Sequence, residues 1–318
     1  MRTTFPNFFA ENLQFTFYIK RMATVADQQL SKGAGLMMEA EAKLNETAGG
    51  CCGAGGRIRV EEACELYVRA ANAFKMTKEW HKAGNAFQEA AALQFKNERW
   101  TESARNYMDA AKAYKKVSAT DCEACLIKAS EIYDDVGRGK VAAKQHMTLA
   151  ELYEEQGNLQ RAVDEYQKAA DMFSGEELAS SATKCNLQIA YHSGTLGDFK
   201  RAEELFVQLG DASVNNKLLK YTATEHFMRA GLCHLTSNPQ DHAGLRQKVE
   251  EWCDTSPAFS ASREKSWLMQ IADAAQKTDV DAFNESIRSY ESVSRLADWE
   301  QSLLKRIRKV LAAGPDLR

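Results

Sequence analysis

The sequence predicts an all-α protein, a solenoid of stacked helix pairs followed by a C-terminal helical bundle. Two observations support this prediction. The chain has 318 residues and only four prolines, with none between Pro6 and Pro239. Proline is excluded from helix interiors because its ring removes a backbone donor and clashes with the preceding turn. The same stretch has the hydrophobic periodicity of helices, and no alternating strand pattern interrupts it.

Composition limits the classes of partner. A hydrophobic content of 44% can fill a core, and 41 Lys and Arg against 44 Asp and Glu leave a net charge of −3. We therefore expect no nucleic-acid partner, although a local basic face remains compatible with this balance. No run of 18 apolar residues is present, so we expect no membrane span.

Residues 1–22 form an atypical N-terminal extension that is rich in aromatic residues. Glu11, Asn12 and Gln14 interrupt its apolar run, which argues against a signal peptide. Met22 is typical of a second start site. Two interpretations stay open: a non-native extension, or a segment that contacts or targets a membrane.

A glycine-rich loop is predicted at 47–57, inside a repeat domain that we place at 23–255. Five of the 18 glycines fall within Gly49–Gly56. The loop lacks the Gly-Lys-Ser/Thr ending and the preceding strand of a phosphate-binding loop. It therefore predicts an interruption between helices and no nucleotide site.

Helix pairs repeat through this domain. Each pair has an aromatic residue near the end of its first helix, then a polar turn, then an alanine early in its second helix. This pattern resembles tetratricopeptide-like (TPR-like) repeats, slightly longer than their usual 34 residues. The aromatic residues, spaced 40, 39 and 38 residues apart, are Phe74, Tyr114, Tyr153 and Tyr191. The alanines are Ala83, Ala124, Ala162 and Ala202.

Glycine and proline mark the turns and the change to the C-terminal bundle, predicted at 256–311. The bundle is expected to hold helices at 262–275, 280–290 and 299–311. A flexible tail is predicted at 312–318, where Gly314 and Pro315 disfavour helix. The turn signals are Gly137, Gly157, Gly194, Gly197 and the stretch 237–239.

No constellation of catalytic or metal-binding residues emerges, so we expect neither enzymatic activity nor a metal or cofactor. Cys122 and Cys125 form a CxxC motif without a second one at ligand spacing, and they sit in a helical pattern, which favours core cysteines. None of the six histidines falls in an HExxH motif. Eight cysteines in a chain of this length form no secreted disulfide framework and indicate a cytosolic protein.

Basic residues recur through the repeats and could line an elongated acidic partner. By periodicity alone, ordinary solvated side chains are the favoured interpretation. The residues are Lys115, Lys116, Arg138, Lys140, Lys144, Arg161, Lys168, Lys184 and Lys220.

Long stretches of the chain closely resemble the soluble NSF-attachment proteins (SNAPs) of α/β type, from about residue 23 to 318. These stretches are IRVEEACELYVRAANAFKMTKEWHKAGNAF (58–87), GRGKVAAKQHMTLAELYE (137–154), SSATKCNLQIA (180–190), LLKYTATEHFMRAGLCH (218–234), SPAFSASRE (256–264), SVSRLADW (292–299) and the terminal DLR (316–318).

The resemblance implies a cytoplasmic, peripherally membrane-associated adaptor in vesicle transport and membrane fusion. Members of this family bind SNARE four-helix bundles through a basic concave face and recruit the hexameric AAA+ ATPase NSF, which disassembles the bundle. Lys144 and Lys184 match basic positions of the family. The further candidates for SNARE binding are Lys115, Lys116, Arg138 and Arg263. A TPR-type scaffold or co-chaperone that binds peptides is the alternative, but the chain shows no clustered Lys/Asn/Arg clamp.

The C-terminal end resembles the part of the family that faces NSF. Leu317 matches a leucine that stimulates the ATPase, and Asp316 and Asp273 are expected at the NSF contact. The chain departs from the family at several positions. Gln188 and Thr224 stand where further basic residues are common, and Gln276 and Lys277 replace acidic residues near Asp273.

The largest departure is the family's membrane-contacting loop, which carries phenylalanines elsewhere but holds Cys51 and Cys52 here. Three interpretations follow: loss of membrane contact, lipidation of the two cysteines, or replacement by the aromatic extension before Met22.

Overall fold

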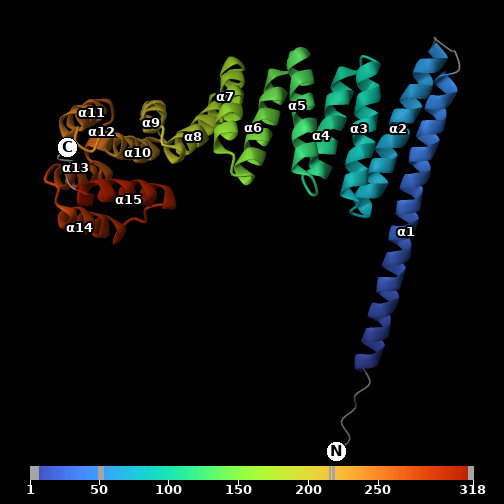
Figure 1. Cartoon of the computed structure of the whole chain (residues 1–318), viewed down its shortest axis with the longest axis horizontal. Helices are drawn as coiled ribbons and strands as arrows, with labels where there is room; N and C mark the ends of the chain where they lie inside the picture. The colour runs from blue at the N-terminus through green and yellow to red at the C-terminus, as the bar shows by residue number, and fades with distance from the viewer. Residues whose placement is uncertain (1–6, 49–53, 215, 217–218, 314–318) are drawn as a thin grey trace, which may run out of the picture. The chain divides into compact units, whose positions relative to one another are not determined.

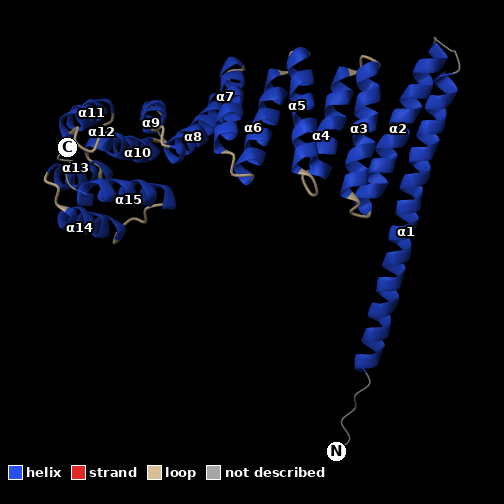
Figure 2. Cartoon of the chain, in the orientation of Figure 1, coloured by secondary structure: helices blue, strands red, loops and turns tan. Residues whose placement is uncertain are grey.

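The structure is a computed structural model that describes residues 7–48, 54–214, 216 and 219–313. Within these ranges every regular element is a helix, labelled α1–α15 (Figures 1 and 2). The chain divides into two compact units, Met1–Leu152 and Tyr153–Arg318, and the boundary lies inside α6 (Gly139–Glu155). The predicted all-α class of helix pairs is confirmed.

The first unit is a row of neighbouring helices, in which each of α1 to α4 packs against the next along the chain (Figure 1). Helices joined by turns of three or four residues run antiparallel. Successive turns therefore lie alternately at the two edges of the row, where the helices end. The bounds are α1 Asn7–Ala48, α2 Ala54–Met76, α3 Trp80–Lys96, α4 Trp100–Tyr114, α5 Ala119–Asp135 and the first part of α6.

The predicted N-terminal extension shares a helix with the first repeat. Helix α1 runs without a break from Asn7 to Ala48, across the predicted boundary at residue 22. It ends inside the predicted glycine-rich loop, and α2 begins at Ala54. Residues 49–53, which include Cys51 and Cys52, lie outside the described residues.

A small buried residue recurs in every helix from α3 to α10. Its N–H donates to the carbonyl of the residue that precedes the helix, and its side chain is buried. Small side chains at this position let neighbouring helices approach closely. Three of the four predicted alanines belong to this pattern, which recurs in every helix, about every 20 residues, and not once per helix pair. The members are Ala83, Ser103, Cys122, Ala142, Ala162, Ala182, Ala202 and Ala223.

Helix α5 corrects one predicted alanine. Ala124 is exposed, and Cys122 holds the buried position instead, only 2% exposed. A reduced cysteine is a small hydrophobic side chain, so it can replace alanine here. Cys125, one turn further along α5, is buried as well.

The predicted aromatic residues fill the spaces between helices. Phe74, Tyr114 and Tyr153 are buried, and Tyr191 is partly buried. The ring of Tyr114 lies directly on Gly84 of α3, where an added Cβ would stand 2.6 Å from the ring. Only glycine permits this close approach.

Seven turns between described helices share one geometry. The first or second residue after the helix has a positive φ, and the N–H of the residue that follows it donates to a carbonyl in the last turn, as in Asn158 N to Tyr153 O at 2.9 Å. This is the Schellman arrangement. It confirms three predicted glycine turns and adds four turns without glycine. The positive-φ residues are Lys78, Glu98, Gly137, Gly157, Glu177, Gly197 and Thr278.

Gly194, predicted as a turn, lies within α8 (Ala179–Leu196). It is buried beneath Trp299, and an added Cβ would stand 2.6 Å from the indole ring. Its role is therefore close packing and not chain reversal.

The second unit continues the helix pairs and ends in a bundle around α10 (Lys220–Ser237). Phe227, Leu232 and Leu235 of α10 are fully buried. This helix contacts helices on both sides of the predicted bundle boundary at residue 256. The other bounds are α7 Leu159–Gly175, α8 Ala179–Leu196, α9 Phe199–Val214, α11 His242–Thr255, α12 Pro257–Ser260, α13 Arg263–Gln276, α14 Val280–Glu291 and α15 Asp298–Ala313.

The three predicted bundle helices are observed as α13, α14 and α15, each within two residues of the predicted ends. Two of them begin at side-chain caps: the Ser262 hydroxyl accepts from Lys265 N, and the Asp279 carboxylate accepts from Ala282 N. Such caps satisfy backbone donors that the first helical turn leaves free.

Candidate basic binding surface

The basic residues predicted in the first unit fall into two groups. Lys115 and Lys116 follow α4, whereas Arg138 precedes α6, so they lie at opposite ends of α5. A helix of 17 residues separates them by about 25 Å. All three side chains are exposed.

Arg138 lies near Arg105, a basic residue that the sequence analysis did not select. The buried Tyr133 hydroxyl feels the positive charge of both Arg138 and Arg105, and Arg138 also acts on Glu102. Burial raises the pKa of Tyr133, and the two guanidinium groups oppose that rise. The turn between α5 and α6 therefore lies beside α4, and Arg105 belongs to the same positive region as Arg138.

Lys144 and Lys184 occupy the same position in equivalent helices. Each stands six residues after the residue that precedes its helix, in α6 and in α8. Arg105 has this position in α4. The side chain is exposed in all three helices.

The intervening helices carry no cation at this position. It is exposed in each of them, so the difference is one of charge and not of burial. Positive charge therefore follows one helix of each pair. The residues are Asn85 in α3, Ala124 in α5, Asp164 in α7 and Glu204 in α9.

Lys144 and Lys184 are available for an external partner. Within the described part of the chain, neither side chain makes an ion pair. An exposed ammonium group binds anions through weak, salt-screened attraction. Each of these ammonium groups can therefore attract an acidic surface from its own unit.

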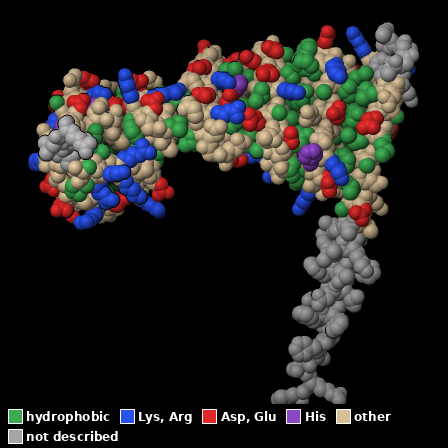
Figure 3. Space-filling view, in the orientation of Figure 1, with side chains coloured by type: hydrophobic (Ala, Val, Ile, Leu, Met, Phe, Trp, Pro, Cys, Tyr) green, Lys and Arg blue, Asp and Glu red, His purple; other side chains and the backbone are tan. Residues whose placement is uncertain are grey.

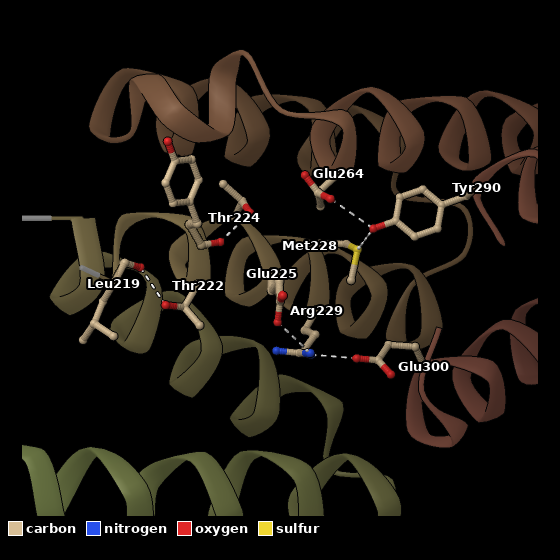
Figure 4. Close-up of polar contacts among 10 residues, drawn as sticks. Leu219, Thr222, Thr224, Glu225, Met228, Arg229, Glu264, Tyr290 and Glu300 are labelled. Carbon is tan, nitrogen blue, oxygen red and sulfur yellow. Dashed lines mark hydrogen bonds and ion pairs between the residues drawn. The ribbon is translucent and has the colours of Figure 1, made fainter. Parts of the chain in front are cut away.

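Helix α10, whose polar contacts are drawn in Figure 4, carries no cation at the equivalent position. The equivalent residue there is Glu225, which accepts a hydrogen bond from Arg229 at 3.2 Å. Thr224, where basic residues were expected, is buried, and its hydroxyl donates to the Tyr221 carbonyl at 2.7 Å. Neither residue adds positive charge to the surface.

Arg263 is held against the C-terminal bundle. Its guanidinium donates to the Ser294 hydroxyl at 2.5 Å, lies over the Tyr290 ring and contacts Glu264 at 3.5 Å. The Tyr290 hydroxyl in turn donates to Glu264 (Figure 4). Arg263 thus differs from Lys144 and Lys184, because its charge is already engaged.

Asp273, predicted at the NSF contact, forms an ion pair with Arg246 of α11. It also borders a groove of about 490 Å³ between α13 and α14, together with Asp279 and Glu285. Asp316 and Leu317 lie outside the described residues.

Five of the six described cysteines are buried, including Cys122 and Cys125 as predicted, and Cys253 is partly exposed. Burial raises the pKa of the Cys125 thiol to about 12 and that of Cys64 to about 11. Among the described residues, no group of three or more His, Cys, Asp or Glu side chains is placed to hold a metal ion. In the same ranges, no helix combines the length and the apolar character needed to cross a membrane.

The comparisons with known proteins agree with the sequence resemblance. Residues 31–312 match the family model described as soluble NSF attachment protein, SNAP. The chain is 40% identical to the beta-soluble NSF attachment protein of Bos taurus, covering 86% of this chain and 92% of the relative. It is 38% identical to the human alpha-soluble NSF attachment protein, covering 89% and 96%. A probable vesicular-fusion protein sec17 homolog of Schizosaccharomyces pombe is 28% identical over 88% and 96%.

Solved structures include helical-repeat proteins. A signal-transduction ATPase with a tetratricopeptide repeat sensor, from Pyrococcus horikoshii, aligns over 96% of this chain and 48% of its own, with a TM-score of 0.42 and 16% identity. A tetratricopeptide repeat protein from Parabacteroides merdae aligns over 87% of this chain with a TM-score of 0.28 and 13% identity.

Proposed function

Because the chain belongs to the soluble NSF attachment protein family, we propose that it is an adaptor for SNARE disassembly. It binds SNARE four-helix bundles and recruits and stimulates the ATPase NSF, in intracellular membrane fusion and vesicle transport. The observation that carries the proposal is the family match across residues 31–312. The adaptor itself performs no chemistry; NSF hydrolyses the ATP.

The SNARE contact is assigned to the exposed cations. Lys144 and Lys184 are its main residues, because they are exposed, share a register and make no ion pair within the described part of the chain. Arg105 joins them by register and by its place beside Arg138. Lys115, Lys116 and Arg138 extend the positive region, and Arg263 contributes less because its charge is engaged.

The NSF contact is assigned to the C-terminal end. The acidic groove beside Asp273 suits a basic partner, although the ion pair with Arg246 reduces the free charge of Asp273. Asp316 and Leu317 are the proposed stimulating residues.

The protein is proposed to act in the cytoplasm at the membrane surface. Cys51 and Cys52 take the place of the family's membrane-contacting phenylalanines, and an acylated pair could anchor the chain. Acyl-exchange labelling tests this point, because unlabelled cysteines would end the lipidation idea.

The four-part division proposed from the sequence places the SNARE contacts in 23–255, apart from Arg263. It places the NSF contacts in 256–311 and in the tail at 312–318. The extension at 1–22 has no assigned contact. The peptide-binding alternative requires a compact clamp, whereas the cations here recur at a register step of about 40 residues.

NSF-dependent disassembly of a purified SNARE complex tests the proposal. Lys144→Glu/Lys184→Glu should abolish SNARE binding and therefore disassembly. Leu317→Ala should still bind SNAREs but fail to stimulate ATP turnover. The matched control is Lys82→Glu/Lys200→Glu, which makes the same charge change on α3 and α9, the helices without cations at the shared position.

The pattern of outcomes separates the assignments. Equal loss of SNARE binding in the test and control variants would show that net charge, and not the position of the cations, determines binding. That result would reject the assigned face. If all variants disassembled SNAREs like wild type, the residue assignments would be wrong. If wild type itself bound neither SNAREs nor NSF, the adaptor function would be rejected.

A further inference from the structure

The two last helices enclose a groove that the SNARE and NSF contacts do not use. It has a volume of about 320 Å³. Each helix contributes residues at i, i+3, i+4 and i+7, the spacing of one helical face. The lining residues are Asn284, Ile287, Arg288 and Glu291 of α14, and Gln301, Leu304, Lys305 and Arg308 of α15.

Charge is unevenly distributed along this groove. At the end near the connecting loop, the Gln301 amide donates to the Glu291 carboxylate at 3.2 Å. Helix register places Lys305 and Arg308 one and two turns further along α15, away from that carboxylate. Arg288 lines the same groove from α14, and in the described region it forms an ion pair with the exposed Glu285.

Lys305 and Arg308 have no ion-pair partner among the described residues. Three cations in one concavity repel each other, and a bound anion would relieve that repulsion. Ile287 and Leu304 form an apolar floor, which lowers the local dielectric and strengthens such attraction. Figure 3 shows Lys and Arg side chains gathered over the region of α14 and α15.

Compensation of the helix dipole does not explain these residues. That effect acts within the last turn of a helix. Helix α15 ends at Ala313, so Lys305 and Arg308 both precede its last turn. Arg306, on another face of the same helix, instead lies over the Phe199 ring.

We propose that the groove between α14 and α15 binds a phosphorylated ligand, with Lys305 and Arg308 as the main phosphate-binding residues and Arg288 as a third. Guanidinium and ammonium groups are the usual partners of phosphate oxygens in proteins. A groove of this size admits a ligand that bears several phosphates, either a phosphoinositide headgroup in a membrane or a free phosphate ester.

The test measures binding of two probes to the full chain: soluble inositol trisphosphate, and phosphatidylcholine vesicles that contain phosphatidylinositol bisphosphate. The variant Lys305→Gln/Arg308→Gln should lose about ten-fold in affinity for the soluble probe. The matched control, Arg306→Gln/Lys309→Gln, removes the same charge from the same helix outside the groove. It should lose no more than about two-fold.

Each outcome decides the proposal. A selective loss in the groove variant supports it, and vesicle binding that the soluble probe competes away assigns the ligand to a membrane. Binding of the soluble probe without vesicle binding supports the site and assigns a free phosphate ester. Equal loss in both variants, or no binding by wild type, overturns the site.

A measurement on the wild-type chain avoids any effect of substitution on folding. Lysine acylation followed by mass spectrometry should show that inositol trisphosphate protects Lys305 and leaves Lys309 reactive. Equal protection of both lysines would overturn the site. The site is independent of the SNARE contact, so SNARE binding should be unchanged in both glutamine variants.

Discussion

Arg229 of α10 and Glu300 of α15 form an ion pair between residues 71 positions apart, with Nε donating to Oε1 at 2.7 Å (Figure 4). The Glu300 side chain is 2% exposed and that of Arg229 is 14% exposed. The second oxygen of Glu300 is buried and has no hydrogen-bond partner in the described part of the chain. Arg229 therefore supplies the main compensation for a buried negative charge.

Removing one partner of this pair should be more costly than removing both. Glu300→Leu should lower the free energy of unfolding by about 3 kcal/mol, because it leaves Arg229 charged and largely buried, with the more exposed Glu225 as its remaining ion-pair partner in the described part of the chain. The double variant Arg229→Met/Glu300→Leu should recover most of that loss. Chemical denaturation of wild type, Arg229→Met, Glu300→Leu and the double variant measures this; additive losses would show that the pair is not coupled.

The left-handed turn residues without glycine are sites for stabilisation. Glu98 and Glu177 hold φ values of 60° and 56°, a region that glycine occupies without steric cost. Glu98→Gly and Glu177→Gly should each raise the free energy of unfolding by about 0.5 kcal/mol. Gly157→Ala, at φ 74°, is the reverse control and should lower it by about 1 kcal/mol. Thermal and denaturant melts compare them, and a loss in both glutamate variants would contradict the argument.

Arg105 should contribute to SNARE binding as much as Lys144 does. Each alanine substitution should weaken binding about three-fold near physiological salt, because an exposed charge contact contributes about 0.5–1 kcal/mol. The effect should shrink as salt increases. Titration against a SNARE complex at two salt concentrations measures it, with Lys82→Ala as control. No change for Arg105→Ala would remove it from the face.

Acid should destabilise the second unit through His226. This side chain is buried, its Nδ1 has no partner among the described residues, and burial lowers its pKa to about 4. The neutral form favours folding above the unfolded pKa, so this stability is lost as pH falls toward 4. Between about pH 7 and about pH 5 the loss from this group is about 2 kcal/mol. His226→Leu should flatten the dependence, as measured by denaturant melts at several pH values.

His234 should act with the opposite sign. Its hydrogen bond to Glu203 raises its pKa, so its contribution is full below the unfolded pKa and is lost as pH rises through the folded value. With His234→Gln, the free energy of unfolding should therefore fall more steeply as pH decreases, whereas with His226→Leu it should fall less steeply. Equal pH dependence in all three proteins would contradict both assignments.

The helical fold could be predicted because its signals are local. The absence of proline and the aromatic spacing act within one helix pair, and the repeats preserve them. The position of the small buried residue within each helix was harder to predict, because the sequence shows the type of a residue and not whether it is buried. In α5 the position of the small buried residue is held by Cys122, whereas Ala124, the alanine that the sequence pattern selects, is exposed.

The candidate surface was predicted in part. Lys144 and Lys184 could be found from the resemblance, and Arg105 could have been found by applying their step of about 40 residues once more toward the N-terminus. Contacts between distant segments gave no signal at all. The pairing of Asp273 with Arg246 and the burial of Thr224 depend on how α10, α11 and α13 pack.

The buried thiols make the protein a reporter of its own local opening. At neutral pH a thiol with a pKa near 12 is almost entirely protonated and reacts slowly with alkylating reagents. Modification of Cys64, Cys125, Cys185 or Cys233 would therefore require the helix around it to open. These four lie in α2, α5, α8 and α10. Their relative alkylation rates would reveal whether neighbouring helices open singly or together, without any introduced probe.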